Sequence, residues 1–417
     1  MHEELRVRVP EILGPAPSIS RPHLVITGPP KLGPDARPLL LCFSHLRWDF
    51  VWQRPQHLLT RAAREYAVVV VEEPVVRSVP APRLDVTTRP HGIRIAVPIL
   101  PEGIGAKAAV QAQRRLLDRF IAEEGRAAQV LWYYTPMAVE FSEHLAADIV
   151  VYDNMDELSA FRGASPELLA NETTLFSRAD LVFTGGLSLF ESKKGRHPNV
   201  FAFPSSIDVH HFAAARVARE REPTDQVAIT RPRLGFFGVI DERMDLDLVD
   251  RVAALKPEWQ LVMLGPVVKI DPAVLPRRPN IHWLGPKTYT ELPAYLAGWQ
   301  VGLMPFALNE ATRFISPTKT PEFLAAGLPV VSTRIKDVVR PYGEKGLVAI
   351  ADSADEIVKL ATQLMARPRE PWLASVDRHL ASGSWDSTWA AMRGAIAKVD
   401  DLPLTTAPAR LGDQATG

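Results

Sequence analysis

The chain alternates short, continuous apolar runs with amphipathic segments, and it does so in two successive series. Strands of a parallel sheet covered by helices on both faces read as continuous apolar runs, whereas half-exposed strands alternate apolar and polar residues. The sequence therefore predicts two doubly wound α/β domains. The predicted strands are 39–43, 67–72, 93–100, 130–134, 148–153, 180–185 and 200–204 in the first series, and 233–240, 259–265, 280–285, 301–306, 328–333 and 346–351 in the second.

A polar, charged stretch separates the two series and marks a domain boundary. A further amphipathic stretch follows the second series, and a proline-rich segment precedes the first. The predicted segments are a flexible Pro-rich tail (1–37), an N-terminal domain (38–212), a linker (213–232), a C-terminal domain (233–375), a C-terminal helix (376–400) and a polar tail (401–417).

Composition narrows the class of protein. Lys plus Arg and Asp plus Glu both number 48, so the charge balance disfavours a nucleic-acid partner. The single cysteine, Cys42, excludes an internal disulfide and favours a reducing compartment. Neither a membrane-spanning apolar run nor a signal-peptide pattern is found in the sequence. We therefore expect a cytoplasmic protein, with peripheral contact at the inner face of the plasma membrane left open.

Ligands of doubly wound sheets bind beyond the carboxyl ends of the strands, so the loops after the predicted strands are the first places to look for a site. The loop at 43–58 contains His45, Trp48 and Arg54. Indole rings with several hydrogen-bond donors are typical of sites for sugars and other polyhydroxylated ligands. This loop is not a G-x-G-x-x-G turn, which argues against a nicotinamide cofactor.

Acidic residues follow the strand predicted at 148–153. Asp153 and Asp156 come at and just after its end. Such carboxylates either orient hydroxyl groups or act as a base, or else they cap the following helix. The sequence leaves both interpretations open.

The loops after the first three strands of the second series carry glycines and a cation. Gly238 lets the backbone approach a phosphate, and Arg243 adds a bidentate positive charge close to a predicted helix start. Gly265 and Pro286 follow the next two strands and complete the predicted donor-binding loops. The D-x-D pattern at 245–247 is interpreted as acids at a helix start rather than as a metal site.

The stretch SPTKTPEFLAAGLPVVST, at 316–333, combines an anion site with a short apolar helix. Two helix starts are possible, with either Ser316 or Thr320 as the N-cap, and the later start is the more regular. Gly327 is predicted to end the helix. Ser316, Thr318 and Lys319 stand beside free backbone N–H groups and predict an anion site. Glu322 either complements the helix dipole or accepts hydrogen bonds from a ribose diol.

The order LGFFG, WQLVMLGP, NIHWLGP, LPAYLAGWQVGLMPF and SPTKTPEFLAAGLPVVST resembles the C-terminal half of retaining glycosyltransferases with the GT-B fold, of the family 4 type. The segments YDNMDE, ADLVFTGGLSLFESK and PNVFAFPSSIDVHHF are similar to the end of the N-terminal domain in that family and to its interdomain crossing. The front loop, with WQRPQHLL, is similar to a bacterial subgroup acting in cell-surface polysaccharide synthesis. The resemblance covers nearly everything from Pro38 to about Lys398.

The resemblance implies two Rossmann-like domains facing each other across a cleft, with the C-terminal helix packing back on the N-terminal domain. It implies a UDP- or GDP-sugar donor, a glycan or lipid-linked acceptor, and transfer of a hexosyl group with retention, without a resident cofactor or metal. Glu322 matches the glutamate that bonds the donor ribose. Lys319 and Arg243 would stabilise the leaving diphosphate, while Asp153, Asp156 and His45 are acceptor-side candidates.

Two departures from the family pattern affect the donor sugar. Phe314 stands where family members often carry a glutamate that contacts the sugar, and Arg243 stands near the place of the usual diphosphate lysine. Two other functions are compatible with this pattern: a GT-B-fold nucleotide-sugar epimerase, and a non-catalytic nucleotide-sugar-binding protein.

Overall fold

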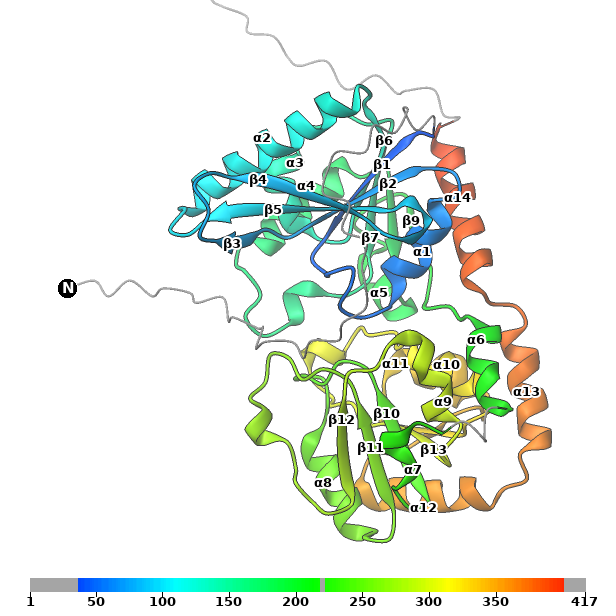
Figure 1. Ribbon diagram of the computed structural model, residues 1–417. Coiled ribbons are helices and arrows are strands. Elements are labelled where there is room, and N and C mark those ends of the chain that lie inside the picture. Colours follow the sequence, from blue (N-terminus) through cyan, green and yellow to red (C-terminus); the bar gives the residue numbers. More distant parts are fainter. Residues whose placement is uncertain (1–36, 218–221, 401–417) are drawn as a thin grey trace, which may run out of the picture.

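A computed structural model describes residues 37–217 and 222–400 of the protein (Figure 1). Two sheet-containing domains lie one above the other in Figure 1, and the last helix runs along the side of the first domain. The two predicted tails lie outside the described residues, except for Arg37.

The sheet of the first domain has the order β3-β5-β2-β1-β6-β7-β8-β9, with β4 paired to β5. All of its described pairings are parallel except the antiparallel pairing of β4 with β5. Its strands are β1 (Leu39–Ser44), β2 (Ala67–Glu72), β3 (Val75–Arg77), β4 (Arg83–Thr88), β5 (Arg94–Pro101), β6 (Ala128–Tyr133), β7 (Ile149–Asn154), β8 (Leu181–Thr184) and β9 (Val200–Ala202).

Helices cover both faces of this sheet, which explains the unbroken apolar strands. Leu40 and Cys42 of β1 pack in one core cluster, whereas Leu39 and Leu41 pack in another, because successive side chains of a strand point to opposite faces. The first cluster includes side chains of α1 (Arg54–Ala62) and α14 (Trp385–Asp400). The second includes side chains of α2 (Ala106–Glu124), α3 (Val139–Ser142) and α4 (Leu168–Arg178). The short helix α5 (Leu187–Lys193) follows β8.

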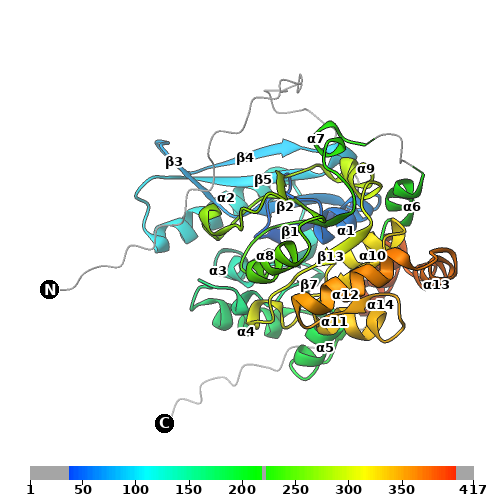
Figure 2. The same ribbon diagram turned by 90° about the horizontal axis from the view of Figure 1, so that it is seen from below.

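The second domain is built around a six-stranded parallel sheet of order β12-β11-β10-β13-β14-β15. Helices α8 and α12 pack against each other, and so do α10 and α13 (Figure 2). Its elements are β10 (Arg233–Phe237), α8 (Leu246–Leu255), β11 (Gln260–Leu264), β12 (Ile281–Gly285), α9 (Leu292–Leu296), β13 (Val301–Met304), α10 (Lys319–Ala325), β14 (Val330–Ser332), α11 (Lys336–Val338), β15 (Ala349–Ile350), α12 (Ala354–Ala366) and α13 (Glu370–Leu380).

The stretch predicted as a linker contains packed structure. Helix α6 (Val209–Ala213) ends at its start, and α7 (Thr224–Val227) lies within it. Gln226 of α7 is fully buried, accepts a 2.7 Å hydrogen bond from Trp299 Nε1 and donates a 3.0 Å bond to the Tyr295 carbonyl. The part of this stretch next to β10 therefore belongs to the packing of the second domain.

Two helix starts differ from the predictions. The pair Ser165-Pro166 in the sequence predicts an N-cap followed by a proline at the first helical position. That prediction is wrong, because helix α4 begins at Leu168 after an N-cap at Glu167, and the Ser165 hydroxyl donates to the Glu167 carboxylate. Helix α10 begins at Lys319, between the two predicted starts. Its end is as predicted: Gly327 has φ +74°, its N–H bonds the Leu324 carbonyl, and the next N–H bonds the Phe323 carbonyl.

Helix α14 returns from the second domain to the first. The Trp385 ring stacks on His57 of α1, with ring centroids 4.6 Å apart and planes at 7°. Asp386 pairs with Arg61 and Arg64. Among the helices of residues 37–217 and 222–400, none combines the length and apolarity needed to cross a bilayer.

Candidate functional site

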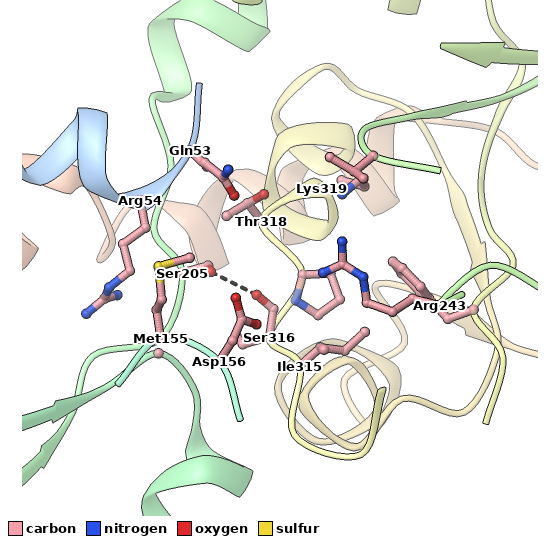
Figure 3. A pocket seen from close by; sticks show the side chains of 14 residues that line it. Gln53, Arg54, Met155, Asp156, Ser205, Arg243, Ile315, Ser316, Thr318 and Lys319 are labelled. Carbon is pink, nitrogen blue, oxygen red and sulfur yellow. Dashed lines mark hydrogen bonds between the residues drawn. The ribbon is translucent and has the colours of Figure 1, made fainter. Parts of the chain in front are cut away.

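A cleft lies between the two domains, where the carboxyl ends of their strands face each other (Figure 3). It is lined from the first-domain side by Gln53, Arg54, Met155, Asp156, Gly185 and Ser205, and from the second domain by Val239, Arg243, Phe306, Ile315, Ser316, Pro317, Thr318 and Lys319. The structure thus brings together six predicted site residues: Arg54, Asp156, Arg243, Ser316, Thr318 and Lys319.

Contacts beside the cleft join the domains. The Ser205 hydroxyl donates a 2.8 Å hydrogen bond to the Ser316 carbonyl. The Ser188 amide, at the start of α5, donates to the Asp337 carboxylate of α11 at 3.0 Å. Elsewhere, Trp52 of the front loop stacks on Tyr289 of the second domain with centroids 5.7 Å apart. The front loop is therefore held against the second domain as well as the first.

Two glycines make room for Lys319. A Cβ on Gly238 would lie 2.2 Å from Lys319 Cε and 2.5 Å from its Nζ. A Cβ on Gly265 would lie 1.8 Å from the Gly238 carbonyl oxygen. Both glycines also have positive φ, +125° and +142°, which other residues rarely adopt. Their role is to bring two strand ends close together beneath the lysine.

The ammonium group of Lys319 has no hydrogen-bond or ion-pair partner among the described residues. Its Nζ lies 5.4 Å from the centroid of the Phe236 ring. Burial, followed by the nearby Arg243 charge, lowers the pKa of Lys319 to about 8. Burial raises the pKa of Glu322 to about 7, against the opposing effect of Lys319. Glu322 is 7% exposed. At neutral pH the entrance of α10 therefore presents a protonated amine and a partly ionised carboxyl group.

Arg243 lines the cleft as predicted, but it does not offer a free charge. Its guanidinium forms a bidentate pair with Asp241, with Nε–Oδ1 at 2.9 Å and Nη2–Oδ2 at 2.7 Å. Asp241 is 3% exposed, and its carboxylate also accepts from the Arg243 amide. Arg243 therefore keeps N–H groups that can donate to a ligand, while the Asp241 carboxylate largely balances its positive charge. Asp245 is the N-cap of α8 and accepts from the Leu248 amide, in agreement with the structural interpretation of D-x-D.

Asp156 is the carboxylate that the first domain presents to the cleft (Figure 3). None of the described residues forms an ion pair with it. Burial raises the pKa of Asp156, partly opposed by the positive charge of Arg243 across the cleft. This carboxylate is free to accept a hydrogen bond from a ligand hydroxyl.

The other acceptor-side predictions need correction. Asp153 is fully buried and is held by Arg54, itself 3% exposed, through Nε and Nη2 at 3.1 and 2.9 Å. These two residues form a buried ion pair instead of offering a free acid and a free cation, although Arg54 also borders the cleft. Trp48 is 8% exposed and packs in the first-domain core, so its ring is unavailable to a sugar.

Five further predicted site residues are absent from the lining of the cleft: His45, Gly238, Gly265, Pro286 and Glu322. Burial, followed by the charge of Lys269, lowers the pKa of His45 to about 4, so its ring is neutral at pH 7. Its Nδ1 is buried without a hydrogen-bond partner among the described residues. Pro286 is exposed. Phe314, the least explained residue of the sequence, is also absent from the lining; the Arg313 guanidinium lies 5.2 Å from its ring centroid.

Gln53 belongs to the front loop that the sequence singled out as a binding loop, and it lines the cleft. Sequence reasoning missed three residues on the first-domain side: Met155, Gly185 and Ser205. Met155 and Gly185 directly follow strand ends, so their positions carried a signal. Ser205 lies on the interdomain crossing, and only the tertiary structure brings it to the cleft.

The amino-acid sequence of this chain is similar to those of known proteins. Residues 231–367 match the family described as "Glycosyl transferases group 1". Over 236 residues, 51% of this chain, it is 29% identical to a putative teichuronic acid biosynthesis glycosyltransferase, TuaH, of Bacillus subtilis (strain 168). That match spans 58% of the length of the Bacillus protein.

Solved structures share the fold at low sequence identity. A sucrose-phosphate synthase of Thermosynechococcus elongatus superimposes with a TM-score of 0.62 at 13% identity, covering 87% of this chain and 99% of that one. Anabaena HepE, solved with UDP and glucose, superimposes with a TM-score of 0.60 at 12% identity, covering 87% and 100%. The second domain is thus similar to group 1 glycosyltransferases over residues 231–367, and the two domains together have the GT-B fold of these solved structures.

Proposed function

We propose that the protein transfers a hexosyl group from a nucleoside diphosphate sugar to an acceptor hydroxyl. The observation that carries the proposal is the Lys319 ammonium at the cleft, opposite the Asp156 carboxylate, both without an ion-pair partner in residues 37–217 and 222–400. In this reaction the bond from the sugar C1 to the diphosphate oxygen breaks and a bond from C1 to the acceptor oxygen forms. Negative charge develops on the leaving diphosphate, and a positioned cation stabilises that charge.

Each side of the cleft has a proposed role. Lys319, with the hydroxyls of Ser316 and Thr318, binds the diphosphate. Glu322, three residues further along α10 and outside the residues that line the cleft, accepts hydrogen bonds from the ribose. Arg243 contributes oriented N–H donors. Asp156 accepts a hydrogen bond from a sugar hydroxyl and orients that group. The acceptor's proton leaves on the nucleoside diphosphate, so the proposal needs neither a protein nucleophile nor a metal.

Retention of configuration and a role in cell-surface polysaccharide synthesis are also part of the proposal. The sequence resemblance to retaining transferases of the family 4 type supports the first, and the similarity to TuaH, described as a putative teichuronic acid biosynthesis glycosyltransferase, supports the second. A UDP-sugar is the first donor to test, since HepE was solved with UDP and glucose. We place the reaction in the cytoplasm, with a glycan or lipid-linked acceptor; the single cysteine supports the reducing compartment.

A nucleotide screen tests the function. Thermal unfolding is measured with UDP, GDP and their sugars, and nucleotide release is then measured with each stabilising donor and a panel of sugar acceptors. We expect stabilisation by one nucleotide series and nucleotide release that depends on an acceptor. No stabilisation by any nucleotide would overturn the proposal. A changed sugar on the donor in the absence of acceptor would instead identify an epimerase.

Glu322→Gln is expected to weaken nucleotide binding about tenfold at pH 7.5, because a charged hydrogen-bond acceptor for the ribose is replaced by a neutral amide. Isothermal titration with UDP measures the change. Glu310→Gln is the matched control: its side chain is 75% exposed and pairs with Arg313 at the surface, so affinity should not change. Equal affinity in wild type and Glu322→Gln would remove Glu322 from the ribose site.

Nucleotide affinity is expected to fall as the pH rises above about 8. Lys319 has a pKa lowered to about 8 in the free protein, so its positive charge is complete well below that pH and is lost as pH rises through it. The Kd for UDP should therefore increase above pH 8 by up to about tenfold per pH unit. In Lys319→Arg, whose guanidinium stays charged, this increase should be absent up to pH 9.5. The same increase in both proteins would assign it to another group.

A further inference from the structure

A network of four charged side chains, with Lys193 and Glu172 buried at its centre, lies behind the loop that carries Asp156. Lys193, at the end of α5, is 4% exposed, and its Nζ lies 2.7 Å from Glu157 Oε2 and 2.8 Å from Glu172 Oε1. Glu172, on α4, is 1% exposed and is also paired with Arg196. The two cations balance the two carboxylates. A network of this kind holds its members in place, because an ion left without its partner in the interior is strongly unfavourable.

The network reaches the strand end that precedes Asp156. The Tyr152 hydroxyl, on β7, donates to Glu172 Oε1 at 3.1 Å. Asn154 Nδ2 donates to the Tyr152 hydroxyl oxygen at 2.7 Å and to the backbone carbonyl of Asp156 at 3.1 Å. The loop is thus attached on the N-terminal side of Asp156 through Asn154.

A second attachment lies on the C-terminal side. Glu157 is bonded to Lys193 through Oε2, and its Oε1 accepts a 2.7 Å hydrogen bond from the Ser159 hydroxyl. These two neighbouring side chains therefore lie on different sides of the loop: Asp156 lines the cleft, whereas Glu157 pairs with Lys193. The backbone carrying the cleft carboxylate is held on both sides by groups that do not themselves line the cleft.

We infer that Glu157, Lys193 and Glu172 form a positioning network that holds the Asp156 carboxylate at its place in the cleft. The inference rests on the proposed function, in which Asp156 orients a sugar hydroxyl. Surface loops are commonly mobile, and a displacement of about 1 Å in a group that orients a substrate is sufficient to lower turnover about 100-fold. The residues of the network act through Asp156 and do not touch the substrate.

A positioning role predicts that loss of the network lowers turnover but leaves donor binding nearly unchanged. Glu157→Ala releases the loop on one side, so we expect kcat to fall about tenfold or more while the Kd for UDP changes less than twofold, because Lys319 and Glu322 lie on the other domain. Glu157→Gln retains an oxygen that accepts from Lys193 and should recover part of the lost kcat. Glu167→Ala is the matched control, since this exposed carboxylate accepts from Ser165, which is not part of the network.

A double-mutant cycle with Asp156→Asn tests whether Glu157 acts through Asp156. Nucleotide release from the donor found in the screen is measured for wild type, both single variants and the double variant, after thermal unfolding confirms that each is folded. We expect Glu157→Ala to lower kcat in wild type but to change it less than twofold in Asp156→Asn. If Glu157→Ala does not fold, the same cycle is run with Glu157→Gln.

Additive losses in an active enzyme would overturn the positioning role and leave the proposed function intact. A tenfold rise in the Kd for UDP in Glu157→Ala, with kcat unchanged, would do the same. Absence of nucleotide binding and turnover in the wild type would overturn the proposed function and the positioning role together. The two failures therefore give different results.

Discussion

Lys319→Met is expected to lower kcat/KM for the sugar donor by about 100- to 1000-fold, the usual loss when one preorganised donor to a developing charge is removed. The side chain borders the cleft, its Nζ has no hydrogen-bond or ion-pair partner among the described residues, and it lies at the entrance of α10. Arg243 cannot replace it fully, because Asp241 already balances that guanidinium. Methionine has a similar length and leaves no large cavity.

The stability of this variant distinguishes lost chemistry from lost structure. Burial lowers the pKa of Lys319 in the folded protein, so the unfolded chain binds the proton more tightly and the charged lysine opposes folding below about pH 8. Lys319→Met should therefore unfold at the wild-type temperature or above it. Lys256→Met is the control, because this lysine pairs with Glu258 just after α8 and does not line the cleft, so its activity should be unchanged. Wild-type kcat/KM in Lys319→Met would contradict the proposed leaving-group role.

Arg54→Met is expected to lower the free energy of unfolding by about 3–5 kcal/mol, because it leaves the Asp153 carboxylate buried without its partner. Asp153 is 0% exposed and Arg54 3%, and the guanidinium also donates to the Phe203 carbonyl at 2.7 Å. A loss of this size is a large fraction of the stability of a typical domain. Urea unfolding followed by tryptophan fluorescence measures it.

Two further variants identify the cause of that loss. Arg54→Met combined with Asp153→Leu removes both buried charges and should be more stable than Arg54→Met alone. Arg83→Met breaks an exposed pair with Asp85 and should leave the unfolding midpoint unchanged. If Arg54→Met is as stable as wild type, the buried Asp153 carboxylate does not need Arg54 as its partner. The assignment of Asp153 to a structural ion pair would then be wrong.

Most strands were predictable from the sequence because a strand buried on both faces must be apolar at every position. The six residues of β1 and of β2 are all buried, and both strands lie within one residue of their predicted bounds. The strands β3 and β4 were missed. Their residues are mostly partly or fully exposed, and β4 lies at the edge of the sheet, so no continuous apolar run marks them.

Some features of the candidate site were likewise predictable from the sequence, and others were not. The sequence alone determined the α/β class and the cluster of Ser316, Thr318 and Lys319, because local spacing places these groups together; the first residue of α10 lies between the two predicted starts. The sequence also singled out Gly238 and Gly265, whose positive φ reflects a local backbone requirement.

Only the tertiary structure decided which charged groups are free. Arg54 and Asp153 are 99 residues apart in the chain and neutralise each other, whereas Asp156, three residues after Asp153, remains unpaired at the cleft. The partners of Glu157 likewise come from other elements. Whether a buried charge serves structure or a ligand depends on the opposite charges that packing brings within about 4 Å, and the order of residues in the chain does not record that distance.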